Sequence, residues 1–168
     1  MTKGMKYHFD AEKGVIYDEV TGDRCFIITK SRLLQIVERL TDLFQSGAQV
    51  IIAEAFKAAG ERYASEVPEE ARVDQVMFLK TSVKRFTDAG LGKIEIVEVK
   101  PKTAEVTFRI WNNFFAEMHN GEATYCHGVA AFASGLYKRI VGKTPEIIET
   151  KCSGKGDPYC EWRVKPAE

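Results

Sequence analysis

An α+β fold, with helices packed against a small antiparallel sheet, is the architecture that the sequence predicts. Apolar residues recur at helical spacing in several long segments, and two other segments alternate apolar and polar residues around a turn. The chain has 168 residues, of which 45% are hydrophobic and 29% charged, as is ordinary for a globular protein. We therefore expect residues 1–168 to form a single domain.

The first half of the chain predicts a hairpin followed by three helices. Two short strands, 15–17 and 25–28, flank the turn at 21–23. Ser31 is placed to cap a helix that runs to about Gln45. A second helix is expected over about 48–64, where many small residues suit close approach to another helix. A third helix is expected from 67–70, beside Pro68, to about Ala89.

The second half predicts two hairpins separated by one helix. The alternation of apolar residues from Ile94 to Ile110, broken by the turn at 100–102, is typical of a hairpin. A helix is expected over about 124–141, ended by Gly142 as its C′ residue. Two strands, 145–152 and 159–164, then flank a glycine-rich turn.

Charge and hydropathy exclude two classes of partner. The 24 basic and 24 acidic residues cancel, and a nucleic-acid binder needs a surplus of cations on at least one face. The N-terminus lacks the apolar core of a signal peptide, and no stretch approaches the roughly 18 apolar residues of a membrane span. We expect a cytoplasmic protein, in which cysteines are more often buried, metal-bound or catalytic than joined in disulfides.

Three of the four cysteines fall where the expected fold brings them together. Cys152 and Cys160 flank the last turn, and Cys126 lies on the apolar face of the helix over 124–141, whereas His127 lies on the other face. A closed tetrahedral zinc site needs a fourth ligand, for which Glu149 is a candidate.

Strand alternation puts residues 149 and 152 on opposite faces, so this site requires either a bulge or a turn that begins at Cys152. A buried, reduced Cys126 beside an incidental Cys152–Cys160 pair is the open alternative. Cys25, next to Phe26 and Ile27, is expected in the core.

Aromatic residues gather near the second hairpin and the helix that follows it. They could line a pocket for a small apolar ligand, or they could fill an ordinary core. The candidate lining residues are Phe108, Trp111, Phe115, Tyr125 and Phe132. A wide apolar stripe on the helix from Ser31 predicts a homodimer through the first two helices, with burial inside the monomer as the alternative.

The segment from Glu149 to Trp162, ETKCSGKGDPYCEW, preceded by Cys126, resembles the signature of the 4-vinyl reductase domain family. The resemblance is strongest over 124–164. It implies a fold similar to the small subunits of vesicle-tethering (TRAPP) complexes, dimerisation through helices, and Zn²⁺ held by Cys126, Glu149, Cys152 and Cys160. Four protein ligands leave no open position, so such a zinc would be structural.

The resemblance also implies a function. Sensor members of the family bind small aromatic molecules, so we expect a zinc-containing domain that binds a hydrophobic or aromatic ligand as a homodimer. We expect neither a catalytic site nor a DNA-binding output domain, since the chain ends soon after the signature. Two alternatives stay open: an enzyme or accessory protein of tetrapyrrole metabolism, and an interaction scaffold without a ligand.

Overall fold

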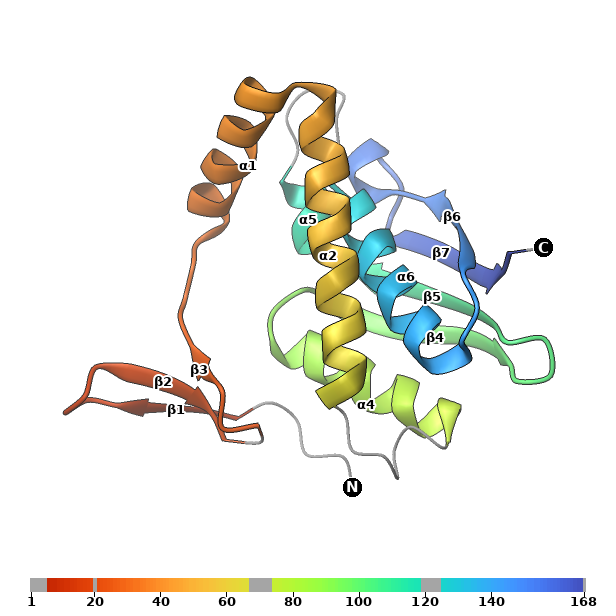
Figure 1. The fold of residues 1–168 in the computed structure, drawn as a ribbon, viewed down its shortest axis with the longest axis horizontal. Helices are drawn as coiled ribbons and strands as arrows, with labels where there is room; N and C mark the ends of the chain where they lie inside the picture. Colours follow the sequence, from red (N-terminus) through yellow and green to blue (C-terminus); the bar gives the residue numbers. More distant parts are fainter. Residues whose placement is uncertain (1–5, 20, 67–73, 119–124, 168) are drawn as a thin grey trace.

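The computed structural model describes residues 6–19, 21–66, 74–118 and 125–167, and it shows two antiparallel sheets joined by helices (Figure 1). The smaller sheet has the strand order β1-β2-β3. Its strands are β1 (Tyr7–Asp10), β2 (Val15–Asp18) and β3 (Arg24–Cys25). The expected hairpin is therefore present, with β1 as an additional strand that the sequence pattern did not reveal.

The expected strand over 25–28 and the core position of Cys25 are both wrong. Only Arg24 and Cys25 pair with β2, and the residues after them run as an extended link toward the first helix (Figure 1). Cys25 is half-buried, and the side chains of Phe26 and Ile27 are 80% and 83% exposed. Apolar residues in this link therefore face outward, where local sequence composition suggested a core.

Three helices follow the link. They are α1 (Lys30–Phe44), α2 (Ser46–Glu66) and α4 (Gln75–Asp88). α4 begins at Gln75 because the carboxylate of Asp74 accepts hydrogen bonds from the backbone amides of Val76 and Met77, at 2.9 and 3.0 Å. The start expected for this helix, at residues 67–70, lies outside the described residues. None of the helices in the described ranges is both long enough and apolar enough to cross a membrane.

The larger sheet has four antiparallel strands in the order β4-β5-β7-β6. They are β4 (Lys93–Lys100), β5 (Glu105–Trp111), β6 (Pro145–Lys151) and β7 (Cys160–Pro166). Both expected hairpins are confirmed. The pairing of β5 with β7, which places Ile110 opposite Cys160, joins them into one sheet.

Helix α6 (His127–Val141) lies between α2 and the larger sheet (Figure 1). α2 and α6 cross with their backbones almost touching, because glycines stand at the crossing. A Cβ atom on Gly60 would lie 2.1 Å from the carbonyl oxygen of Phe132, and one on Gly135 would lie 1.9 Å from that of Lys57. The small residues expected to permit close helix packing therefore do so, and α6 is held at a fixed depth over the sheet.

The main core lies between α6 and the sheet. Trp162 of β7 is 1% exposed and its ring stacks on that of Phe108 in β5, with ring centroids 5.2 Å apart. Ile110 and Cys160 extend this cluster toward the short helix α5 (Phe114–Glu117), which the sequence pattern did not reveal. The same face of the sheet carries the chemistry described next.

Candidate metal centre and apolar cavity

Three cysteines and one glutamate meet at one end of the larger sheet. Cys126 is the N-cap residue of α6, Glu149 lies in β6, Cys152 follows β6, and Cys160 begins β7. One ligand atom from each of the four residues lies within 4.8 Å of all the others. All three cysteines are buried, so the sulfur atoms are enclosed by protein.

Strand alternation alone would put the side chains of Glu149 and Cys152 on opposite faces of the sheet. Two irregularities in the backbone bring them to the same face. The register between β6 and β7 shifts between Glu149 and Lys151, and β6 ends at Lys151. Cys152 then starts the short 3₁₀ helix η1 (Ser153–Lys155), and its amide donates to the Asp157 carboxylate at 2.8 Å. Both the expected bulge and the expected turn are present, and together they turn the Cys152 side chain toward Glu149.

Hydrogen-bond donors surround the sulfur atoms. The backbone amide of Ser153 donates to Cys160 Sγ at 3.3 Å, and the Ser153 hydroxyl lies 3.1 Å from the same sulfur. The amide group of Asn113 donates to Cys160 Sγ at 3.3 Å and to Cys126 Sγ at 3.6 Å. Such donors favour a thiolate over a neutral thiol.

The four ligand groups differ in acidity. Hydrogen bonding from Cys126, followed by bonds from Ser153 and Asn113, lowers the pKa of Cys160 to about 5. The bond to Cys160, together with burial, raises the pKa of Cys126 well above its usual range. Burial raises the pKa of Glu149 above its ordinary value. Cys160 is therefore the first of these thiols to ionise, and a bound cation would favour the ionised forms of Cys126 and Glu149 as well.

The sulfur separations fit a metal site. Cys126 Sγ lies 3.5 Å from Cys152 Sγ and 4.0 Å from Cys160 Sγ, far beyond the roughly 2.05 Å of a disulfide. Thiolates at about 2.3 Å from a tetrahedral metal ion stand about 3.8 Å apart. Oε1 of Glu149 is buried and makes no hydrogen bond within the described part of the chain. These four residues could hold a metal ion.

A cavity of about 290 Å³ lies beside this group, between the sheet and helices α2, α4 and α6. Its wall is almost wholly apolar and includes Phe108, Phe115 and Phe132 from the expected set. Asn113 also lines it, so one side chain touches both the cavity and the sulfur atoms. Sequence reasoning missed Asn113, although its position as the N-cap of α5, bonded to the Phe115 amide, is a recognisable role.

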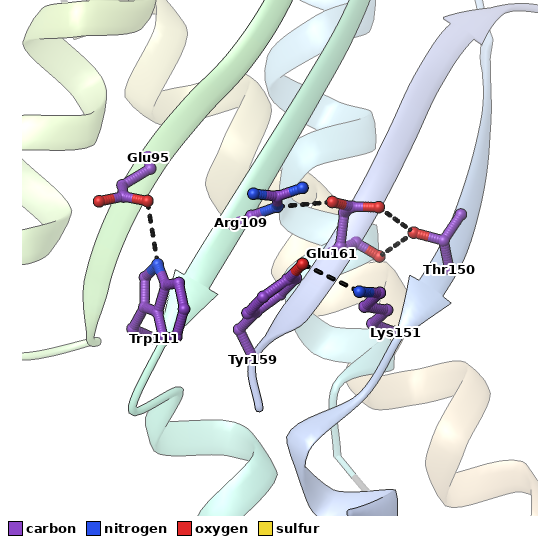
Figure 2. A network of polar contacts seen from close by, with 7 residues as sticks. All are labelled: Glu95, Arg109, Trp111, Thr150, Lys151, Tyr159 and Glu161. Carbon is purple, nitrogen blue, oxygen red and sulfur yellow. Dashed lines mark hydrogen bonds and ion pairs between the residues drawn. The ribbon is translucent and has the colours of Figure 1, made fainter. Parts of the chain in front are cut away.

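Trp111 and Tyr125, the other two residues expected to line a pocket, do not line this cavity. Trp111 follows Ile110 in β5 and so points to the opposite face of the sheet. There its indole donates to Glu95 at 2.9 Å and packs on Tyr159, with ring centroids 4.7 Å apart (Figure 2). Tyr125 packs instead in a second apolar cluster with α1 and α5.

The outer face of the sheet is bound together by charged and aromatic side chains (Figure 2). Arg109 donates to Glu161 at 2.6 Å, and the Thr150 hydroxyl donates to the same carboxylate at 2.7 Å. The Lys151 ammonium donates to the Tyr159 hydroxyl at 2.9 Å. The bonds between Arg109 and Glu161 and between Thr150 and Glu161 tie β5, β7 and β6 to one another on the face away from the cavity.

Comparison with protein families matches residues 106–166 to the 4-vinyl reductase domain. An uncharacterised protein of Methanocaldococcus jannaschii is 35% identical over 76 residues, which are 44% of each chain. The bacteriochlorophyll synthase 23 kDa chain of Cereibacter sphaeroides is 31% identical over 81 residues, 48% of this chain and 37% of that protein. The aligned region thus spans less than half the length of these curated relatives.

Two solved structures share the fold. The phenol-responsive sensory domain of the transcription activator PoxR, solved with phenol, superposes with a TM-score of 0.79 at 22% identity, over 95% of this chain and 84% of that one. A trafficking protein particle complex subunit 3 from Naegleria fowleri, covalently bound to palmitic acid, has a TM-score of 0.59 at 13% identity, over 83% and 95%. The expected α+β fold and its likeness to TRAPP subunits are confirmed.

Proposed function

Because residues 106–166 match the 4-vinyl reductase domain, we propose that this chain is a sensory domain that binds a small, largely apolar molecule in the cavity beside the cysteine group. The single observation that supports the proposal most is the cavity itself, with its apolar wall. Protein interiors are normally close-packed, and ligand sites are concave and mainly apolar with few polar groups. β5, α6 and β7 of the matched segment supply part of the wall, and α4 supplies another part.

The ligands named for the two structural neighbours are of the same chemical kind. One neighbour was solved with phenol and the other is bound to palmitic acid, and both molecules are largely apolar. Identities of 22% and 13% relate the folds alone, so the transfer of ligand type to this chain is part of the proposal.

We extend the proposal to Zn²⁺ at Cys126, Glu149, Cys152 and Cys160. Zinc takes thiolate and carboxylate ligands in tetrahedral geometry, and four protein ligands leave no position for a substrate. Bound there, the metal would supply structural cross-linking between the start of α6 and the β6–β7 hairpin. Because α6 and β7 both contribute to the cavity wall, this cross-link would hold the wall in place.

The ligand proposal is tested by purifying the chain from its native host and extracting the protein for mass spectrometry. We expect a small apolar molecule in near-stoichiometric amount. A tetrapyrrole chromophore would favour the second candidate, a role in tetrapyrrole metabolism, for which the similarity to the bacteriochlorophyll synthase chain is the specific observation. Protein that is empty after purification, and that binds no apolar probe afterwards, would contradict both and favour a scaffold.

We further propose that a second copy of the chain covers the exposed apolar surface of the link and α1. Phe26, Ile27 and Ile36 are 80%, 83% and 51% exposed and line one groove. Exposed apolar patches of this kind are typical of interaction sites. Light scattering should give twice the chain mass of 18.9 kDa, and Phe26→Ser should reduce it to one chain. Val97→Ser, at an exposed position in β4, is the matched control, and a wild-type mass of one chain would contradict the dimer.

A further inference from the structure

Asn113 stands between the apolar cavity and the group of three cysteines and Glu149. Its side chain is 1% exposed and forms part of the cavity wall. Its amide nitrogen also donates to Cys160 Sγ at 3.3 Å and to Cys126 Sγ at 3.6 Å. One buried side chain therefore touches both the place proposed for a ligand and the place proposed for a metal.

The orientation of the Asn113 amide group is fixed by the backbone. Asn113 is the N-cap residue of α5, and its Oδ1 atom accepts a hydrogen bond from the Phe115 amide at 3.1 Å. Because the oxygen is held there, the NH₂ group faces the sulfur atoms, and its two hydrogens match two sulfur acceptors. Phe115 itself lines the cavity, so the start of α5 makes contacts with both places.

Two further residues of the cavity wall are joined to the cysteines through the backbone. Ile110 lines the cavity and stands opposite Cys160 in the pairing of β5 with β7. Val129 also lines the cavity, and its amide donates to the carbonyl oxygen of Cys126 at 3.0 Å. Ile110, Cys126 and Cys160 belong to one buried cluster, with Val129 packed against it. Short segments of β5, β7 and α6 thus both form the wall and position two of the sulfur atoms.

We infer that Asn113 couples the two places, so that a ligand in the cavity tightens metal binding at the cysteine group. This inference rests on the proposed function and adds the regulation of that site. A ligand that fills the cavity restricts the Asn113 side chain and the wall segments beside it. The four metal-binding residues are then already ordered before a metal arrives, and less conformational entropy is lost on binding. By linkage, the metal must tighten ligand binding by the same factor.

The exposure of the cysteines decides the sign of the coupling. A ligand that removed water from ionised sulfur atoms would weaken metal binding, since burial disfavours a charged group. That cost is already present without a ligand, because Cys126, Cys152 and Cys160 are 1%, 3% and 0% exposed. What a ligand adds is order in the shared wall, and the coupling is therefore positive.

The test measures the Zn²⁺ affinity of the full chain by chelator competition, with and without saturating 4-propylphenol. In the wild type we expect the probe to lower the zinc dissociation constant about fivefold, at the low end of couplings between sites. Isothermal titration calorimetry should give a probe dissociation constant about fivefold lower for the zinc-loaded chain than for the metal-free chain. Asn113→Ser keeps a side-chain oxygen to cap α5 and loses both donors, so its coupling factor should fall below about twofold.

Ser153→Ala separates coupling from simple support of the sulfur atoms. The Ser153 hydroxyl lies 3.1 Å from Cys160 Sγ, but Ser153 does not line the cavity. This variant should bind Zn²⁺ more weakly than the wild type, and the probe should still tighten its binding about fivefold. Asn113→Asp also keeps the cap and loses both donors, so it should show the same loss of coupling as Asn113→Ser and replaces that variant if it fails to fold.

A probe that binds the wild type but leaves its zinc affinity unchanged, or weakens it, would overturn the inference and leave the proposed function standing. The full wild-type factor in Asn113→Ser or Asn113→Asp would overturn the assignment to Asn113. A wild type that binds no probe would overturn both the inference and the proposed function. A wild type that binds no Zn²⁺ would overturn the inference together with the zinc site.

Discussion

Alanine at Gly135 should push α6 away from α2. The Cβ atom would lie 1.9 Å from the Lys57 carbonyl oxygen, 2.8 Å from its carbonyl carbon and 2.9 Å from the Glu61 amide nitrogen. All three are backbone atoms of α2, so no change of side-chain rotamer relieves the contact. Restoring an ordinary contact near 3.4 Å requires a displacement of about 1.5 Å between the two helices.

The free energy of unfolding should fall by about 2 kcal/mol. Overpacking in a close-packed interior costs about 1–3 kcal/mol, and backbone atoms place this site at the upper end of that range. About 1 kcal/mol of this loss is offset, because alanine has a higher helix propensity than glycine. Gly128, in the same helix, is the control. A Cβ atom there meets only the Phe56 ring at 3.4 Å, so Gly128→Ala should change stability by no more than about 1 kcal/mol.

Urea unfolding followed by circular dichroism measures both variants, with linear extrapolation to water. The expected order of stability is wild type or Gly128→Ala first and Gly135→Ala last. Gly135→Ala as stable as Gly128→Ala would refute the helix crossing described here, and with it the fixed depth of α6 over the cavity.

Three further predictions concern the metal group and the outer face. Asn113→Asp should weaken Zn²⁺ binding on the order of 10–100-fold in chelator competition, because a carboxylate replaces the amide that donates to two sulfur atoms; unchanged affinity would refute that role. Cys152→Ser should lower the zinc content measured by elemental analysis below about half an equivalent, whereas Cys25→Ser should leave it unchanged. Glu161→Gln should cost about 1 kcal/mol of stability at pH 7, because the bond from Arg109 lowers the pKa of Glu161. Because the pKa of Glu161 is lower in the folded state, this carboxylate stabilises the fold above the unfolded pKa near 4.5, and the stabilisation is lost as the pH falls through the folded pKa. The urea midpoints at pH 7 and pH 4 should therefore differ less in Glu161→Gln than in the wild type. Equal differences in the two proteins would contradict this.

The grouping of the three cysteines with Glu149 was predictable because its members are marked by residue type. Spacing brought the three cysteines to one place with Glu149 as a candidate fourth member, and the helix face favoured Cys126 over His127. The resemblance to the 4-vinyl reductase domain family implied the full set of four, and the structure brings these four residues together. The backbone path was only half predictable. The alternation of side chains along a strand showed that Glu149 and Cys152 could share a face only if the strand was irregular. In the structure a register shift and the end of β6 at Lys151 act together. Both depend on pairing with β7, which no local sequence pattern encodes.

Residue type was a poorer guide to the cavity wall than to the group of three cysteines and Glu149. Aromatic composition alone put Trp111 with Phe108, although strict alternation along β5 separates them by face, and that rule was sufficient to exclude Trp111. Asn113 was recognisable as the N-cap of α5, but its contacts with the sulfur atoms and with the cavity were not. Those contacts follow from the packing of α5 against the sheet, so only the three-dimensional arrangement reveals them.

The exposed link between β3 and α1 was misjudged for a similar reason. Cys25, Phe26 and Ile27 have the composition of a core strand, and composition does not say whether any other element of the chain covers them. In the structure the pairing with β2 stops at Cys25, so the side chains of Phe26 and Ile27 are left exposed.

Binding of a small apolar molecule in the cavity between α4, α6 and the larger sheet can be followed residue by residue by methyl NMR during titration with 4-propylphenol. Saturable shifts should appear at the cavity methyl groups of Leu79, Val83 and Ile96, while the exposed methyl groups of Val50 and Ile148 stay unchanged. Shifts confined to exposed methyl groups, or no saturable shift at any of the three cavity residues, would contradict it.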